Sequence, residues 1–147
     1  VIEQNIRLNE YERTGINVDA VLTSQLLINI FEHNTPLHDG AVLVRGNRIV
    51  AATCYLPLSD NMELSKQLGT RHRAGVGISE VSDSLTIIVS EETGQVSVAQ
   101  DGKLSRGLTS AELRASLVKA QNKKVVNNSK LRHLLKGRTK HEEDKAD

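Results

Sequence analysis

Three short motifs of this 147-residue chain carry side chains that could take part in chemistry. The first is His38-Asp39-Gly40-Ala41, where a loop leads into an apolar run. A glycine beside a carboxylate lets a ligand approach the main chain closely while the acid points at it. The acid could orient a hydroxyl, act as a general base or hold a metal ion. Asp-Gly is also a common turn dipeptide, so an ordinary turn is the competing interpretation.

The second motif is Gly69-Thr70-Arg71-His72-Arg73. Glycine ends one element, and Thr70 is expected to cap the helix that follows, which leaves the amides of its first turn pointing outward. The helix dipole favours an anion at this position and disfavours arginine, yet two arginines occur here. A bound anion would resolve this conflict, and phosphate matches both the amides and the guanidinium forks. The competing interpretation is a pair of surface arginines in ordinary salt bridges.

The third motif is Ser90-Glu91-Glu92-Thr93-Gly94, which follows the strongest strand pattern in the chain. A hydroxyl and paired carboxylates could bind a phosphate and a divalent cation, with Mg²⁺ or Mn²⁺ as the natural choice. His38 could be a further Mn²⁺ ligand, and a solvated hairpin turn is the competing interpretation. The sequence has no Walker-type phosphate loop and no Gly-x-Gly-x-x-Gly run, so any nucleotide is bound by another route.

The elements that must position these motifs alternate between helical and extended patterns. Helices are expected over 19–31, with Asp19 as its cap, over 59–68, over 70–83 and from 109 onward. A β-hairpin is expected over 41–55, and further strands over 85–89 and 95–100. Gly75 and Gly77 each cost about 1 kcal/mol relative to alanine inside a helix, so we expect another segment to approach that helix closely.

Composition excludes several classes of protein. Cys54 is the only cysteine, which rules out a disulfide scaffold and favours a reducing compartment. Aromatic residues make up 2% of the chain, too few for a platform that stacks single-stranded nucleic acid. No apolar run is long enough to cross a bilayer, and no His/Cys cluster has the spacing of a structural zinc site. A soluble, intracellular α/β or α+β domain with an aliphatic core remains.

Charge is distributed unevenly along the chain. Residues 1–121 carry 14 acidic and 11 basic side chains, a net of −3, whereas residues 122–141 carry seven Lys/Arg and no acid. We therefore expect a folded domain over 1–121 and a basic, flexible tail over 122–147. The tail is either a solvated terminus or a basic patch that faces anionic lipid or an acidic partner. Because the positive run is terminal, nucleic-acid binding is not expected. Val1-Ile2-Glu3 is interpreted as the second half of a strand, so we expect this chain to be a piece of a longer protein.

Together these motifs resemble the diadenylate cyclase domain family. The resemblance runs from about residue 11 to residue 109. Its most specific parts are the paired Asp-Gly-Ala and Arg-His-Arg motifs, and Tyr55-Leu56-Pro57-Leu58-Ser59, Ser79-Glu80 and residues 90–94 agree with it. Gly75 departs from the family pattern, which commonly has a second alanine after Arg-His-Arg. The resemblance implies a mixed α/β fold in which helices flank a central mixed β-sheet.

The resemblance also implies an activity and the residues that perform it. Two ATP molecules would condense to the second messenger cyclic di-AMP and two pyrophosphates, with a divalent metal ion, Mn²⁺ or Mg²⁺, as cofactor. Asp39 would activate or orient the 3′-hydroxyl, and Arg71 and Arg73 would hold phosphates. The expected nucleotide-binding residues are Gly40, Ala41, Tyr55, Leu56, Gly69, Thr70, His72 and Ser90, of which Tyr55 and Leu56 border the adenine. Glu92 is the expected metal ligand, followed by Glu91 and His38.

In this family two domains face each other, each with one ATP, so a homodimer is expected. The resemblance is greatest to membrane-anchored bacterial cyclases, in which transmembrane helices precede a cytosolic cyclase domain. A membrane regulator and a sugar-phosphate mutase are the partner proteins that it implies. The alternative is a module that senses ATP or cyclic di-AMP without making it. Asp39 discriminates between the two, because a sensor needs no carboxylate beside a reacting hydroxyl.

Overall fold

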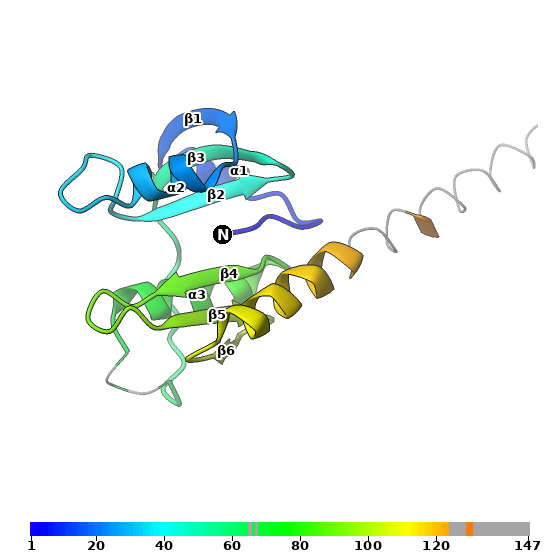
Figure 1. Ribbon diagram of the computed structural model, residues 1–147. Helices are drawn as coiled ribbons and strands as arrows, with labels where there is room; N and C mark the ends of the chain where they lie inside the picture. Colours follow the sequence, from blue (N-terminus) through cyan, green and yellow to red (C-terminus); the bar gives the residue numbers. More distant parts are fainter. Residues whose placement is uncertain (65, 67, 124–128, 131–147) are drawn as a thin grey trace, which may run out of the picture. The chain divides into compact units, whose positions relative to one another are not determined.

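The computed structural model describes residues 1–64, 66, 68–123 and 129–130. The chain divides into two units, Val1–Thr109 and Ser110–Asp147, which are described separately. The elements of the first unit are α1 (Asn9–Glu12), β1 (Ile16–Val21), α2 (Ser24–Ile30), β2 (Ala41–Arg45), β3 (Arg48–Cys54), α3 (Thr70–Val81), β4 (Thr86–Val89), β5 (Val96–Gln100) and β6 (Lys103–Ser105) (Figure 1).

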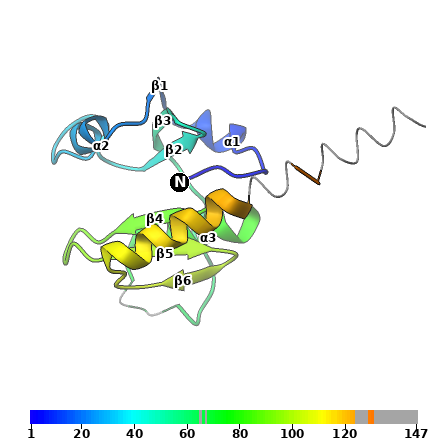
Figure 2. The ribbon, with the colours of Figure 1, turned by 45° about the vertical axis from the view of Figure 1, so that its right-hand side comes forward.

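The strands form two antiparallel sheets of three strands, ordered β1-β3-β2 and β4-β5-β6. Ile2 joins them, because it pairs in parallel with Val44 and antiparallel with Leu85. Four backbone hydrogen bonds of 2.8–3.1 Å link residues 1–3 to Val44 of β2 and to Leu85, which directly precedes β4. Figure 2 shows this amino-terminal segment between the two sheets. The expectation of a central mixed sheet flanked by helices is therefore confirmed, and Val1-Ile2-Glu3 is strand-like as expected.

A buried carboxylate fixes the amino-terminal segment to the first sheet. Glu3 is 4% exposed and accepts hydrogen bonds from the Arg45 side chain at 2.8 and 3.0 Å and from the Leu8 amide at 3.0 Å. Burial alone would raise the pKa of Glu3, but the hydrogen bonds from Arg45 and Leu8 outweigh it and hold the pKa below its usual value. Arg45 also pairs with Glu12 of α1. Breaking such a buried pair leaves a charge uncompensated, so this contact holds the joint between the sheets.

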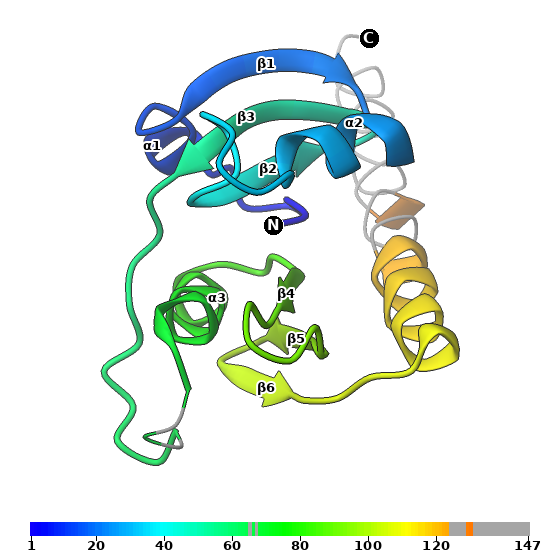
Figure 3. The ribbon, with the colours of Figure 1, turned by 60° about the vertical axis from the view of Figure 1, so that its left-hand side comes forward.

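Helix α3 covers the second sheet, and its two glycines make close packing possible. A Cβ atom on Gly75 would lie 2.7 Å from the Ile88 side chain of β4, and one on Gly77 would lie 1.9 Å from the Pro57 carbonyl oxygen. The expected close approach is therefore confirmed at both positions. Figure 3 shows residues 55–64, which follow β3, running along one side of the unit.

Several predicted elements have different boundaries in the structure. The helix expected from Asp19 begins at Ser24, because Thr23 is its cap and accepts a hydrogen bond from the Leu26 amide, while Asp19 lies in β1. Thr70 is not a cap either, since Gly69 holds that position and makes no side-chain cap bond. The described residues of the expected helix 59–68 form turns and bends or have no assigned structure. The hairpin over 41–55 and the strands near 85–89 and 95–100 are confirmed.

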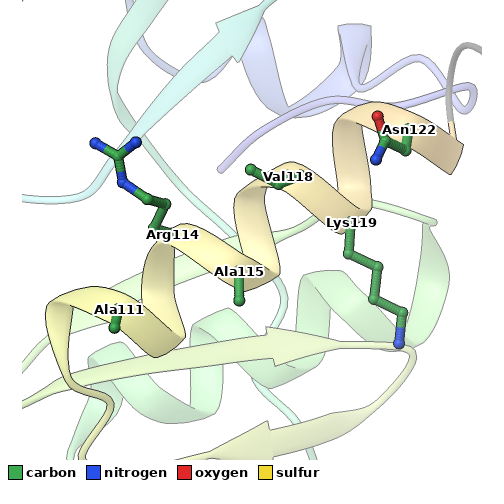
Figure 4. A pocket seen from close by; sticks show the side chains of 6 residues that line it. All are labelled: Ala111, Arg114, Ala115, Val118, Lys119 and Asn122. Atoms are coloured by element: carbon green, nitrogen blue, oxygen red, sulfur yellow. The ribbon is translucent and has the colours of Figure 1, made fainter.

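The second unit contributes a helix over residues 110–123, where one was expected. Ala111, Arg114, Ala115, Val118, Lys119 and Asn122 line an open depression on it (Figure 4). None of the candidate site residues belongs to this helix. Among the described helices, none combines the length and hydropathy that a bilayer-spanning segment requires. Apart from residues 122–123 and 129–130, the predicted tail over 122–147 lies outside the described residues, and its boundary stays a prediction.

Candidate active site

Asp39 and Gly40 lie directly before β2. Gly40 has a φ of +87°, and a Cβ there would come within 2.9 Å of the Thr53 backbone in β3. The fold itself therefore requires glycine at this position. The Asp39 side chain is exposed, and its Oδ1 accepts a hydrogen bond from the Gly40 amide at 3.2 Å. No ion pair joins Asp39 to another described residue, so its carboxylate is available at the edge of the sheet.

The end of β3 lies beside this motif, because Ala41 pairs with Cys54. Tyr55 follows directly and is 75% exposed, while its backbone amide donates to the Thr14 hydroxyl at 2.8 Å. Leu56 packs against the core cluster that contains Leu8 and Leu43. The two residues expected at the adenine thus differ: the Tyr55 ring is free to contact a ligand, and Leu56 connects that position to the core.

The first turn of α3 holds the two arginines, and each has a different partner. Arg71 forms an ion pair with Glu91. Arg73 has no carboxylate partner among the described residues, and its guanidinium lies 3.5 Å from the Ser59 carbonyl oxygen. The competing interpretation, an ordinary salt bridge, is therefore seen at Arg71 and not at Arg73. Arg73 keeps most of its five donors for a ligand.

His72 lies between the two arginines and is only 8% exposed. Burial, together with the positive charge of Arg106, holds the pKa of His72 below its usual value. The imidazole is therefore neutral at pH 7. It can support the loop or donate one hydrogen bond to a phosphate, but it adds no charge to the site.

Residues 90–94 form a closed turn between β4 and β5. The Ser90 amide donates to the Gln95 carbonyl at 3.0 Å, and the Ser90 hydroxyl accepts from the Thr93 amide at 3.3 Å. Gly94 closes the turn with a φ of +70°. The carboxylate of Glu92 is exposed and forms no ion pair with a described residue. The turn therefore presents the unpaired Glu92 carboxylate to the solvent, together with the hydroxyls of Ser90 and Thr93.

Strand pairing brings the three motifs to the same edge of the sheet. Because β2 is parallel to the amino-terminal segment and β4 is antiparallel to it, the start of β2 and the end of β4 lie at one edge. Asp39 is five residues from Val44, and Ser90 is five residues from Leu85, so both lie at about the same level. Figures 1 and 3 show the loop before β2 and the β4–β5 turn at this common end.

Arg71 reaches the same edge, because it contacts Glu91 of the β4–β5 turn, and Arg73 belongs to the same first turn of α3. The structure thus brings together the surroundings of Asp39, Tyr55, Arg71 and Ser90, although no ion pair joins Asp39 to Arg71 or Arg73 in the described part of the chain. The spacing of residues within each motif could not predict this arrangement, because it depends on backbone pairing between residues as distant in the sequence as Ile2 and Leu85.

The expected metal ligands do not form a cluster. Within the described residues there is no group of three or more His, Cys, Asp or Glu side chains that could hold an ion. Glu91 is occupied by Arg71. The Nδ1 atom of His38 lies 2.7 Å from the Thr35 carbonyl oxygen, so it carries the proton and leaves the Nε2 lone pair free. Glu92 and His38 Nε2 fit a divalent ion only if phosphates and water supply its other ligands, which is common for Mg²⁺.

Ser59 is a positioning residue whose contacts could not be predicted from the sequence. It is 3% exposed; its amide donates to the Arg73 carbonyl at 2.9 Å, and its hydroxyl donates to the Glu80 carboxylate at 2.6 Å. These bonds attach the segment that follows Tyr55 to α3. No local signal announces them, since Ser59 lies 14 and 21 residues from its partners.

Residues 1–104 match the family described as DAC, "DisA bacterial checkpoint controller nucleotide-binding". The chain belongs to the DAC family. This confirms the resemblance on which the sequence-based expectations rest. The matched residues contain all three motifs of the candidate site.

Curated DAC proteins and solved DAC structures are similar to this chain. It is 61% identical over 116 residues to "Cyclic di-AMP synthase CdaA" of Bacillus subtilis and 55% identical over 118 residues to a "Diadenylate cyclase" of Listeria monocytogenes. These alignments cover 79% and 80% of this chain but 42% and 43% of the relatives, so the chain spans about two fifths of their length.

Two solved structures support the fold. A crystal structure of a double mutant of DacA from Staphylococcus aureus has a TM-score of 0.79 and 51% identity, covering 81% of this chain and 79% of that one. The crystal structure of a hypothetical membrane spanning protein from Bacillus cereus has a TM-score of 0.71 and 48% identity, covering 74% of this chain and 53% of that one. The mixed α/β fold of this DAC chain is therefore shared with experimental structures.

Proposed function

We propose that this chain is a diadenylate cyclase domain that condenses two ATP molecules into cyclic di-AMP and two pyrophosphates. The observation that supports the proposal is that the loop before β2, which carries Asp39, and the β4–β5 turn, which Arg71 contacts through Glu91, follow paired strands to the same end of the sheet. The names of the curated relatives agree with this reaction.

In each half-reaction, the 3′-oxygen of one ATP would form a bond to the α-phosphorus of the other. The bond from that phosphorus to the bridging oxygen of the β-phosphate would break, and pyrophosphate would leave with its electron pair. Asp39 would orient the attacking hydroxyl and accept its proton. Arg71 and Arg73 would stabilise the charge that develops on the phosphate oxygens, so positioning and electrostatics suffice without a covalent intermediate.

The remaining expected residues have supporting roles in this proposal. Gly40 and Ala41 would place backbone groups beside the nucleotide, and Tyr55 would cover the adenine. Gly69, Thr70 and Ser90 would contact the phosphates from the start of α3 and from the β4–β5 turn. His72, neutral and nearly buried, would hold the loop between the arginines.

A divalent cation, Mn²⁺ or Mg²⁺, would neutralise part of the triphosphate charge when bound. Glu92 and His38 Nε2 are the protein donors that we propose for it, whereas Glu91 would have to release Arg71 first. The ion would therefore enter with the nucleotide rather than occupy a preformed site.

We further propose the assembly and setting of this domain. One site binds one ATP, so two domains must face each other to complete the ring, and a homodimer is the active species. The chain would be the cytosolic domain of a membrane-anchored protein, and its similarity to the membrane spanning protein of Bacillus cereus supports this setting. A membrane regulator and a sugar-phosphate mutase are its proposed partner proteins, by family likeness.

Product analysis tests the cyclase proposal directly. Wild-type protein incubated with ATP and Mn²⁺ should form cyclic di-AMP, identified by mass spectrometry. Asp39→Asn should form little or none while it still binds ATP, because the amide cannot accept the proton. Equal product from both proteins would refute the role of Asp39. ATP binding without any product from the wild type would instead favour the sensor module.

A further inference from the structure

Arg106 lies at the same sheet edge as the candidate active site, although no motif contains it. Ser105, the last residue of β6, pairs with Val98 of β5, and the Leu108 amide donates to the Val96 carbonyl at 2.9 Å. After β6 the chain continues alongside β5 towards Val96, the first residue of β5, and Arg106 lies on this stretch. Since Val96 pairs with Val89, this is the end of β5 next to Ser90 and the β4–β5 turn.

The first turn of α3 lies near Arg106 as well. Helix α3 packs on β4, β5 and β6, and its first turn is fixed to the β4–β5 turn by the ion pair of Arg71 with Glu91. The positive charge of Arg106 also acts on His72, whose pKa it helps to lower. Arg106 therefore lies near the helical turn that carries Arg71, His72 and Arg73.

The Arg106 side chain has no structural partner among the described residues. It is exposed and makes no ion pair or hydrogen bond with a described residue. Of the three arginines, only Arg71 has a carboxylate partner among the described residues. Arg73 and Arg106 would repel each other at one edge, and an anion placed between them would relieve that repulsion.

We propose that Arg106 binds the terminal phosphates of the nucleotide, the part that leaves as pyrophosphate, as a third guanidinium opposite Arg71 and Arg73. This inference rests on the proposed function. Arg71 and Arg73 project from the helix, and Arg106 approaches from the end of β6, so the phosphates lie between two elements. A guanidinium suits this role because its planar fork contacts two phosphate oxygens at once.

Binding measurements on the intact chain test the inference, with three probes that differ in their phosphates. The probes are α,β-methylene-ATP, in which the reacting bond cannot break, AMP, and inorganic pyrophosphate, each titrated calorimetrically with Mg²⁺ present. The variants are Arg106→Ala, Arg106→Lys and Lys103→Ala. Lys103 is the matched control, because it is an exposed cation on the same strand but pairs with Gln100, at the opposite end of β6.

We expect Arg106→Ala to bind α,β-methylene-ATP and pyrophosphate about 10- to 100-fold more weakly, since one charge-assisted contact is lost. Its affinity for AMP should equal that of the wild type. Arg106→Lys should recover part of the affinity, and Lys103→Ala should bind like the wild type. A thermal melt of each variant, with Arg106→Gln as a second neutral replacement, separates loss of binding from loss of folding.

Unchanged affinity for α,β-methylene-ATP and pyrophosphate in Arg106→Ala would overturn the inference. An equal loss for AMP, or the same loss in Lys103→Ala, would also overturn it. The outcomes distinguish it from the cyclase proposal. If the wild type makes no cyclic di-AMP but Arg106→Ala still loses pyrophosphate, the phosphate contact is supported and the cyclase proposal fails. If product forms and Arg106→Ala binds normally, only the inference fails. If the wild type binds none of the probes, both fail.

Discussion

Replacing Gly77 by alanine should displace the segment that connects the two halves of the candidate site. The added Cβ would lie 1.9 Å from the Pro57 carbonyl oxygen, 2.7 Å from its carbon and 2.9 Å from the Ser59 nitrogen. All three are backbone atoms, so no side-chain rotation can relieve the clash. The segment must move away from α3 by roughly 1.5 Å to restore ordinary van der Waals separation.

The cost of this movement follows from the contacts that it disturbs. Overpacking costs about 1–3 kcal/mol. The bonds from Ser59 to the Arg73 carbonyl and to the Glu80 carboxylate contribute about 1 and about 1.5–3 kcal/mol. Removing a glycine from a helix returns about 1 kcal/mol. We expect a net loss of about 2.5–6 kcal/mol in the free energy of unfolding, and a Tm lower by about 5–24 °C for a chain of this size.

Gly75→Ala is the matched control for this prediction. It offers the same gain in helix propensity, but its Cβ would meet Cγ1 and Cδ1 of the Ile88 side chain rather than backbone atoms. Overpacking of about 1–3 kcal/mol, less the roughly 1 kcal/mol from helix propensity, gives a net loss of about 0–2 kcal/mol in the free energy of unfolding, without the loss of the Ser59 hydrogen bonds. Thermal melts and the rate of cyclic di-AMP formation well below Tm should be measured for both variants. Gly77→Ala should also raise the KM for ATP, because Leu56 and Arg73 adjoin the displaced contacts.

Two results would refute this reasoning. A Gly77→Ala variant as stable as Gly75→Ala would mean that the segment 55–61 does not depend on its contact with α3. A stability loss without any change in KM for ATP would mean that the segment is structural and does not position the nucleotide.

Three further predictions concern charge and assembly. Because the pKa of Glu3 is depressed in the folded chain, its ionised carboxylate stabilises the fold fully above its unfolded pKa, and this stabilisation is lost as pH falls below about 4.5. Glu3→Gln should therefore be less stable at pH 7, and its Tm should fall less than that of the wild type between about pH 7 and about pH 3. An equal fall in Tm in both proteins would contradict this. Arg71→Lys should reduce product formation by about 10-fold or more, because lysine lacks the planar fork, while its Tm stays nearly constant; full activity would make Arg71 a surface residue. Specific activity should rise with protein concentration until dimers saturate, as followed by light scattering, and a constant rate with monomers alone would exclude the face-to-face requirement.

Local patterns in the sequence predict the elements well where a residue type, such as glycine, is required for one specific structural reason. Gly46-Asn47 turns the hairpin of β2 and β3, and Gly75 and Gly77 mark the close contacts of α3. The caps were predicted less well. Asp19 and Thr70 are both acceptable cap residues, but Thr23 and Gly69 hold those positions, because tertiary packing decides which turn of a periodic segment becomes helical.

The candidate site could be predicted as a set of motifs but not as an arrangement. Asp39, Arg71 and Ser90 were identified by their types and neighbours, and the DAC match covers them all. Their common edge depends on the double pairing of Ile2 with Val44 and Leu85, residues 42 and 83 positions away. Arg106 belongs to no motif, and only the course of β6 places it near the others. Pairings of this range leave no periodic trace in a single sequence.

The three residues at the amino end of the chain form the hydrogen-bonded connection between the two sheets. Their four backbone hydrogen bonds are the ladder that holds one sheet to the other, and Glu3 anchors it. A force applied at Val1 would act first on these four hydrogen bonds, because they are the ones nearest to that residue. Breaking them would part β4, which ends just before Ser90, from β2, which begins two residues after Asp39, so tension on this segment would separate the two parts of the candidate site while each sheet kept its own strand pairing.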